Sequence, residues 1–527
     1  MRDFQFPGRS PVHATNGMAA TSHPLATGAA IDVLKSGGNA MDAAIAAAAV
    51  LAVVEPQSTG IGGDCFVLFC PKGDGRVIAF NGSGRSPRAA TLDWYQEQGI
   101  KEIATDSVHS VTVPGAIDAW TTLNRDHGTK DLAELLAPAI RYAEEGYPVH
   151  ARVRFDWLRC IDLLSKDENA KTLFLPGGRV PAEGDLHRQP QLAATLRAIA
   201  KDGRAAFYEG PIAEAMVEYL RAKGGLHVPE DFAATRGDYV EPIATRYRGV
   251  DVHQVPPNNQ GLTALLMLNI LEAFDLGRLD PMGSERLHLE VEAGRLAYRV
   301  RDTAIAELPA MTVAVADLLS KDHAASLRAQ IRPDAALTLP DPALAKSDTV
   351  YLCVVDRDLN AVSFINSIYH SFGSGILCPR TGVLFQNRGA SFRVDPRHPN
   401  RIGPEKRPMH TIMPGMAVKD GRALMPYGVM GGDYQPFGHV HLLTGVLDYG
   451  LDVQAALDAP RVFYADGAIE AERGIPGASL AGLTEKGHKV QVAAEPHGGG
   501  QAILIDHARG ILTGGSDPRK DGCALGF

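Results

Sequence analysis

The chain is predicted to be an α+β protein that folds as an αββα sandwich, two sheets face to face with helices outside. Helical periodicity dominates the first part of the sequence, whereas strand-like segments dominate after Thr349. Residues 349–355 and 361–368 are apolar on both faces, so they should be buried on both sides. Sheets of that kind need a covering layer on each face, which gives the four-layer arrangement.

The N-terminal region supplies the first helices and strands. Ser22 can cap one helix, and Asn39 can cap a second, alanine-rich helix that ends before Pro56. A glycine-rich loop over residues 59–64 then leads into a hairpin over residues 66–80. These elements form the first helical layer and the first strands of the predicted sandwich.

The middle of the chain is predicted to be mainly helical and to end in a linker. Proline and glycine punctuate helical patterns over residues 110–330. Residues 331–348 hold three prolines and show little periodicity, which is typical of an exposed linker. Two further hairpins are expected at 416–426 and 501–513, with a helix from about Asp433.

Composition and charge exclude several functions. The net charge of −9 disfavours nucleic acid and anionic membranes as partners, because both need a basic face. The six cysteines include no C-x-x-C pair, so no zinc knuckle or redox motif is predicted. The longest apolar stretch is too short to span a bilayer, and the N-terminus lacks the apolar core of a signal peptide. We therefore expect a cytoplasmic protein without a cofactor or catalytic metal.

One hairpin places two hydroxyl groups together. The turn over residues 356–360 is polar, and a hairpin symmetric about Asp358 pairs Thr349 with Ser367. Directly opposed residues have Cβ atoms roughly 4.5–5.5 Å apart, so the hydroxyls can form a hydrogen bond. Without further context, an ordinary cross-strand Thr–Ser pair is the more frequent reason for such a pattern.

Several segments resemble, in order, the γ-glutamyltransferase (γ-glutamyltranspeptidase) family. The N-terminal run SHPLATGAAIDVLKSGGNAMDAAIAAAAVLAVVEPQSTGIGGD is similar to its N-terminal signature, and KSDTVYLCVVD to the region where the proenzyme cuts itself. The likeness covers nearly the whole chain, at residues 22–64, 110–120, 346–356, 372–376, 403–408, 428–433, 448–462 and 516–522.

This resemblance implies a self-cleaving amino-terminal nucleophile (Ntn) hydrolase with an αββα sandwich. The cut would fall between Asp348 and Thr349, giving a large fragment 1–348 and a small fragment 349–527 that stay together as a heterodimer. Whether that heterodimer pairs again is left open. The freed α-amine has an ordinary pKa of about 7.7–8.0, so it can take the proton of its own hydroxyl.

The resemblance also assigns roles to three further residues. Ser367 corresponds to the hydroxyl that orients the nucleophile, which agrees with the pairing from the hairpin. Gly431 and Gly432 correspond to the oxyanion hole, where backbone N–H groups stabilise the developing negative charge. Without the family context, a tight strand-to-helix turn would account for these glycines equally well.

The substrate-binding positions depart from those of γ-glutamyl enzymes. Ser391 stands where γ-glutamyl enzymes have the acidic residue that binds the substrate's amine. An ammonium group would therefore find no anionic partner in this chain. Carboxylate recognition is retained in altered form, and we expect a small amide that bears a carboxylate and lacks an α-amine. This pattern resembles the oxamate amidohydrolase and glutaryl-cephalosporin-acylase sub-group, and hydrolysis of oxamate to oxalate and ammonia is favoured. The predicted substrate-binding residues are Arg85, Tyr369, Arg388, Ser391, His410 and Thr411.

Several of these residues also fit purely structural roles. Arg85 can be a surface turn residue, Arg388 can hold a structural carboxylate, and His410 can be a packed core histidine. The enzyme can also be a glutathione hydrolase or a glutaryl-cephalosporin-type acylase, or the chain an unprocessed binding protein. Zinc hydrolysis is disfavoured because no H-E-x-x-H occurs, and His439 and His441 would point apart on a helix.

Overall fold

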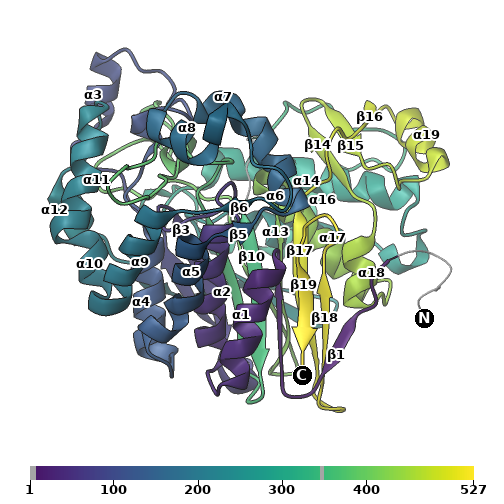
Figure 1. Cartoon of the computed structure of the whole chain (residues 1–527). Helices are drawn as coiled ribbons and strands as arrows, with labels where there is room; N and C mark the ends of the chain where they lie inside the picture. Colours follow the sequence, from purple (N-terminus) through teal and green to yellow (C-terminus); the bar gives the residue numbers. More distant parts are fainter. Residues whose placement is uncertain (1–7, 343, 345–348) are drawn as a thin grey trace.

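A computed structural model shows the predicted αββα sandwich (Figure 1). It describes residues 8–342, 344 and 349–527. Two seven-stranded sheets lie face to face, and helices cover both outer surfaces. In the part of the chain that is described, no helix is both long and apolar enough to cross a bilayer. All six cysteines are free, and five of them are buried.

The first sheet, called the β10 sheet below, carries the two strands of the central hairpin. Both strands are fully buried, as their apolar sequences predict. In order across the sheet, its strands are β19 (Cys523–Gly526), β2 (Gly17–Thr21), β10 (Val350–Asp356), β11 (Ala361–Ser367), β3 (Asp64–Cys70), β4 (Ile78–Gly82) and β7 (Asp238–Val240).

The second sheet, called the β13 sheet, is built mainly from later residues. Its order is β1 (Val12–Ala14), β18 (Ile511–Ser516), β17 (Gly499–Asp506), β13 (Arg422–Met430), β12 (Gly415–Lys419), β9 (Val250–Gln254) and β8 (Ile243–Tyr247). The predicted hairpins β12–β13 and β17–β18 are confirmed. Strands β7, β8 and β9 lie inside a region predicted to be mainly helical, so that prediction was incomplete.

The alternation of side chains along β10 explains the layers. Tyr351, Cys353 and Val355 point toward the β13 sheet and form the core between the sheets. Val350, Leu352 and Val354 point the other way, into a helical layer. The helices that supply most of this layer are α1 (Pro24–Lys35), α2 (Ala40–Val54), α4 (Ala116–His127), α5 (Leu132–Glu145), α9 (Pro190–Asp202) and α11 (Gly210–Ala222).

A second helical layer covers the outer face of the β13 sheet. It consists of α13 (Gly261–Leu271), α14 (Ser284–Ala304), α17 (Gln435–Leu447) and α18 (Val453–Asp458). Beside it lies a small sheet of β14 (Val462–Ala465), β15 (Ala468–Ala471) and β16 (Val490–Val492), together with α19 (Gly477–Glu485). The remaining helices are α3 (Leu92–Glu97), α6 (Ala151–Trp157), α7 (Ile161–Leu164), α8 (Glu168–Phe174), α10 (Arg204–Tyr208), α12 (Pro229–Ala234), α15 (Val315–Leu318) and α16 (Lys321–Arg328).

The two predicted helix caps differ in outcome. Asn39 caps α2 and forms a reciprocal capping box with Asp42, as expected. The prediction that Ser22 caps α1 was wrong. Because Pro24 occupies the first helical position, the cap falls on His23, whose Nδ1 accepts a hydrogen bond from Leu25 N at 3.3 Å.

The described part of the predicted linker 331–348 runs across the second helical layer. His288 Nε2 lies 2.7 Å from the carbonyl of Arg332, and Leu337 N donates to Glu292 at 3.1 Å. Farther along, the Tyr464 hydroxyl donates to Asp341 at 2.9 Å. The segment therefore has its backbone anchored at intervals although many of its side chains are exposed.

Candidate active site

The hydroxyl groups of Thr349 and Ser367 form the centre of the candidate site. The β10–β11 register pairs Val350 with Asn366, and one step further it brings Thr349 opposite Ser367. Thr349 Oγ1 donates to Ser367 Oγ at 3.3 Å, and both residues are fully buried. This confirms the pairing predicted from the turn. Asp348, the other residue at the predicted cut, lies outside the described residues.

The glycine-rich loop at residues 59–64 supports this hydroxyl pair from one side. Asn366 Nδ2 donates to Thr59 Oγ1 at 2.8 Å, which fixes the end of β11 against the loop. A Cβ atom on Gly63 would lie 2.2 Å from the carbonyl oxygen of Ser367, so only glycine fits there. The loop therefore places Ser367 by direct backbone contact.

A glycine turn approaches from the β13 sheet. Gly431 and Gly432 follow β13 and precede α17, both in left-handed backbone with φ of 110° and 59°. Their carbonyls accept hydrogen bonds from Tyr434 N and Gln260 Nε2, each at 3.0 Å, and the same turn carries the N–H groups of the two glycines. Such N–H groups can stabilise an oxyanion.

Gln435 connects this glycine turn with the hydroxyl pair. It is the first residue of α17, its Nε2 donates to Thr349 Oγ1 at 3.5 Å, and its Oε1 accepts from Met413 N at 3.0 Å. Behind the turn, the buried side chains of Asp433 and Arg301 form an ion pair. The position of the turn relative to Thr349 is therefore fixed by both a neutral and a charged contact.

Arg388 is the most unusual side chain near the hydroxyl pair. It is fully buried; its Nη1 donates to Thr411 Oγ1 at 3.0 Å, and its guanidinium lies 3.9 Å from the centre of the Tyr369 ring. Its Nε and Nη2 have no hydrogen-bond partner among the described residues. Burial lowers the pKa of Arg388 to about 10, so it is still a cation at neutral pH. A buried cation with free donors is suited to bind an anion.

Tyr369 joins Arg388 to the hydroxyl pair. Its backbone N donates to Ser367 Oγ at 2.9 Å, while its ring packs on the Arg388 guanidinium. Its φ of 79° is strained for a residue other than glycine, at a cost of roughly 1–3 kcal/mol. Burial raises the pKa of its phenol to about 12. Strain of this kind is commonly retained where it places a functional group.

His410 faces Asp64 instead of an open site. Its Nε2 lies 2.7 Å from Asp64 Oδ2, and its Nδ1 lies 3.1 Å from Asn258 Nδ2. Burial, followed by repulsion from Arg388, lowers the pKa of His410 to about 4, so the ring is neutral. Asp64 Oδ1 also accepts from Gly84 N and Gly115 N. His410 thus belongs to a satisfied hydrogen-bond network, which favours the core-histidine alternative.

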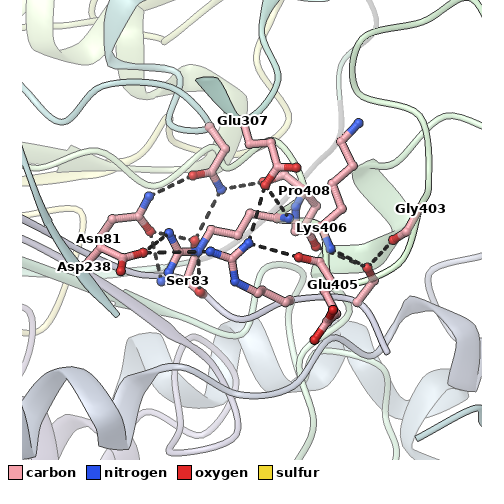
Figure 2. Close-up of polar contacts among 12 residues, drawn as sticks. Asn81, Ser83, Asp238, Glu307, Gly403, Glu405, Lys406 and Pro408 are labelled. Atoms are coloured by element: carbon pink, nitrogen blue, oxygen red, sulfur yellow. Dashed lines mark hydrogen bonds and ion pairs between the residues drawn. The ribbon is translucent and has the colours of Figure 1, made fainter. Parts of the chain in front are cut away.

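The structure places Arg85 in a separate polar cluster and gives Ser391 an internal partner. Arg85 Nη1 donates to the carbonyl of Glu405 at 2.9 Å and lies 3.6 Å from Glu307. Figure 2 shows the polar contacts of this region, among them those of Glu307 and Glu405. These contacts fit the structural alternative for Arg85, while its place in a substrate site stays a prediction. The Ser391 hydroxyl donates to the carbonyl of Met409 at 2.8 Å.

A cavity of about 510 Å³ reaches the glycine turn. It is lined by Gly431, Asp433 and His370 on the side of the candidate site, and by Leu344 of the predicted linker. Its outer wall is charged, with Arg159, Lys166, Asp466, Glu470 and Glu495 among the lining residues. The cavity is the natural approach to the turn for a molecule from solvent.

Three site residues were not predicted from the sequence. Asp64 and Asp433 each end a glycine motif, GIGGD and GVMGGD, and those motifs were the available signal. Gln435 follows the second motif by two residues, but nothing in the sequence says that its side chain turns back toward Thr349. That contact depends on how α17 leaves the glycine turn.

Known proteins resemble this chain in both sequence and fold. The family model described as Gamma-glutamyltranspeptidase matches residues 26–527. A "Glutathione hydrolase-like YwrD proenzyme" of Bacillus subtilis is 38% identical, covering 98% of this chain and 99% of the relative. An "Oxamate amidohydrolase proenzyme" of Klebsiella pneumoniae is 36% identical, with coverage of 98% and 99%. The crystal structure of a cephalosporin acylase from Bacillus halodurans superposes with a TM-score of 0.94 at 41% identity, covering 100% and 99%.

Proposed function

The chain belongs to the gamma-glutamyltranspeptidase family of Ntn-hydrolase proenzymes, and from this premise we propose that it cuts itself before Thr349 and then hydrolyses a small carboxylate-bearing amide, with oxamate preferred. Two steps make up the proposal. The first breaks the chain's own backbone, and the second uses the new chain end on a substrate.

Self-cleavage breaks the bond between Asp348 and Thr349. The Thr349 hydroxyl attacks the preceding carbonyl, the C–N bond breaks, and the acyl group moves from nitrogen to oxygen. Water then hydrolyses the ester, leaving fragments 1–348 and 349–527 with a free carboxylate and a free α-amine. Thr349 is already held by Ser367 and Gln435, so its hydroxyl is oriented before the cut.

Turnover then uses the same hydroxyl. The neutral α-amine accepts the hydroxyl proton while the oxygen attacks the substrate amide, and the amine product leaves with that proton. The N–H groups of Gly431 and Gly432 stabilise the negative charge on the tetrahedral oxygen. Water hydrolyses the acyl-enzyme and releases the acid. An ordinary α-amine pKa of about 7.7–8.0 predicts that kcat/KM rises as pH increases through this range.

The observation that carries the substrate proposal is the pair of free donors on Arg388. A buried guanidinium whose Nε and Nη2 have no partner among the described residues matches a carboxylate, which can accept both bonds at once. The remaining nitrogen of the guanidinium, Nη1, donates to Thr411 Oγ1. Tyr369 fills the space over the guanidinium and favours a small acyl group.

The same residues disfavour an α-amine on the substrate. Ser391 offers no negative charge, and its hydroxyl is engaged by the Met409 carbonyl. The nearby carboxylate of Asp433 is already paired with Arg301. An ammonium group placed here would lose its hydration without gaining an anionic partner.

A second candidate is an acylase that releases a larger amine. The cavity of about 510 Å³ next to Gly431 has far more room than the ammonia released from oxamate requires. In that case Arg388 still binds the carboxylate of the acyl group, as in a glutaryl amide. The two candidates share the acyl site and differ in the leaving group.

A substrate panel tests both candidates. Protein that has produced two bands on a denaturing gel is incubated with oxamate, glutaryl amides and γ-glutamyl anilides, and product release is measured. Turnover of oxamate supports the first candidate, and turnover of glutaryl amides alone supports the second. Fast γ-glutamyl turnover would contradict the role given to Ser391. A single intact band with no turnover would indicate a binding protein.

A further inference from the structure

We propose that His288, Glu292 and His488 form a binding site for one divalent transition-metal ion, preferentially Zn²⁺. The three residues are buried, and their ligand atoms lie within 4.8 Å of one another. The site lies apart from the candidate active site, between α14 and the end of α19.

The positions of the three side chains are fixed by the fold. His288 and Glu292 are four residues apart on α14, so they project from one face a single turn apart. His488 follows α19 after Gly487, whose φ of 90° turns the chain, and its backbone N donates to the Leu483 carbonyl at 3.1 Å. Two residues of one helix and a third from a fixed turn therefore meet at one point.

The hydrogen bonds around His288 leave the correct nitrogen available. Its Nε2 lies 2.7 Å from the carbonyl of Arg332, which can only accept, so the proton sits on Nε2. The lone pair of Nδ1 then points toward His488 Nε2, at 2.8 Å. A carbonyl on the distal nitrogen is the partner that metal-binding histidines commonly have.

Hydrogen bonds also hold the carboxylate of Glu292 in place, as they do the imidazole of His288. One of its oxygens accepts from Leu337 N at 3.1 Å, and the other accepts from Arg295 at 2.9 Å and lies 3.8 Å from His488 Nε2. Two neutral imidazoles and one carboxylate are a ligand set typical of zinc.

Binding requires one local change. Two ligands of tetrahedral zinc lie roughly 3.3 Å apart, so the imidazole nitrogens must separate by about half an ångström. His488 must also change tautomer, so that its ring proton sits on Nδ1 and its Nε2 is free to bind the metal. Arg295 and Lys486 are the nearby cations that oppose a metal, and Asp334 is the nearby anion that favours it. These charges predict that the site binds Zn²⁺ with moderate affinity. A water molecule would occupy the fourth coordination position of the metal.

The test is to titrate chelator-treated full-length protein with Zn²⁺ alone and to measure binding by calorimetry. A second titration uses Co²⁺ and monitors visible absorption. We expect one ion per chain and the absorption of a tetrahedral Co²⁺ site. His488→Ala and Glu292→Gln should each weaken binding by about tenfold or more. His13→Ala, which removes an exposed histidine, should leave it unchanged.

Two outcomes would overturn the site. Either the wild type binds no ion, or His488→Ala binds as tightly as the wild type. Circular dichroism and thermal unfolding of each variant, recorded without metal, separate loss of binding from loss of folding. The measurement does not depend on amide turnover, so failure of the proposed hydrolase activity leaves it unaffected.

Discussion

Two buried arginines, Arg388 and Arg407, show how the same side chain can serve a binding region and a structural region. Arg407 donates to the carbonyl of Ser83 at 3.1 Å, to Asp238 at 2.6 Å and to the carbonyl of Arg236 at 2.8 Å. Arg388 has one hydroxyl partner and an aromatic ring, with two donors left over. Around Arg407 the protein supplies the acceptors; around Arg388 the described residues leave two donor nitrogens without one, which fits the carboxylate-binding role proposed for it.

The largest expected effect comes from removing the proposed nucleophile, Thr349. Thr349→Ala should abolish both chain cleavage and turnover, with activity lower by at least about 10³-fold, because no other group supplies the hydroxyl. Denaturing gels and product assays measure the two effects. Normal cleavage in this variant would refute the assignment and remove the reason to see Arg388 as part of a reactive region.

The glycine turn offers the next largest effect. Gly431→Ala should lower kcat by about 10²–10³-fold, because the turn that presents the N–H donors cannot keep its shape. The added Cβ would lie 2.9 Å from Gly498 Cα, at a φ of 110°. Gly450→Ala is the matched control: it also has positive φ, but open space around it. If the control loses as much activity, backbone strain alone accounts for the result.

A direct comparison exchanges the two arginines for methionine. Arg388→Met should lower kcat/KM for the carboxylate substrate by about 10²-fold, since a charge-assisted pair is lost, and leave stability nearly unchanged. Arg407→Met should instead lower the free energy of unfolding by about 2–4 kcal/mol, because three acceptors lose their donor. Steady-state kinetics measure kcat/KM of both variants, and urea unfolding measures their free energies of unfolding. Equal stability losses would contradict the distinction between the regions.

The smallest effect concerns acid stability. His410 has a pKa of about 4 when folded and about 6.5 when unfolded, so between these values the unfolded chain binds more protons. The contribution of the neutral, buried His410 to the free energy of unfolding is complete above pH 6.5 and is lost as the pH falls. At pH 5.5 this loss is about 1.4 kcal/mol. His410→Asn should therefore reduce the difference in unfolding free energy between pH 7 and pH 5.5. The exposed His13→Asn should not change that difference.

Much of the fold and the centre of the site could be predicted because they depend on local patterns. The pairing of Thr349 with Ser367 follows from the symmetry of one short turn, and the layers follow from strands that are apolar on both faces. Arg388 was a candidate from its position in the family pattern, although the sequence could not show that its donors are free.

What was missed depends on contacts between distant segments. Arg85 is a candidate in the sequence, but its hydrogen bond to the carbonyl of Glu405, more than 300 residues later in the chain, could not be predicted from it. The proposed metal site has no counterpart in the sequence-based prediction, because its third ligand, His488, lies 196 positions after Glu292 and no short motif encodes such a spacing. Side chains that meet only through tertiary packing leave no local signal.

The order of strands in the β10 sheet has a consequence for how the molecule must be made. Residues before and after position 348 alternate across it: β19, then β2, then β10 and β11, then β3, β4 and β7. Neither half of the chain therefore supplies all of its strands as one block, and the two halves are interleaved. A chain cut at that point is expected to elute as one particle, and halves produced from separate genes would each need the other to complete the sheet.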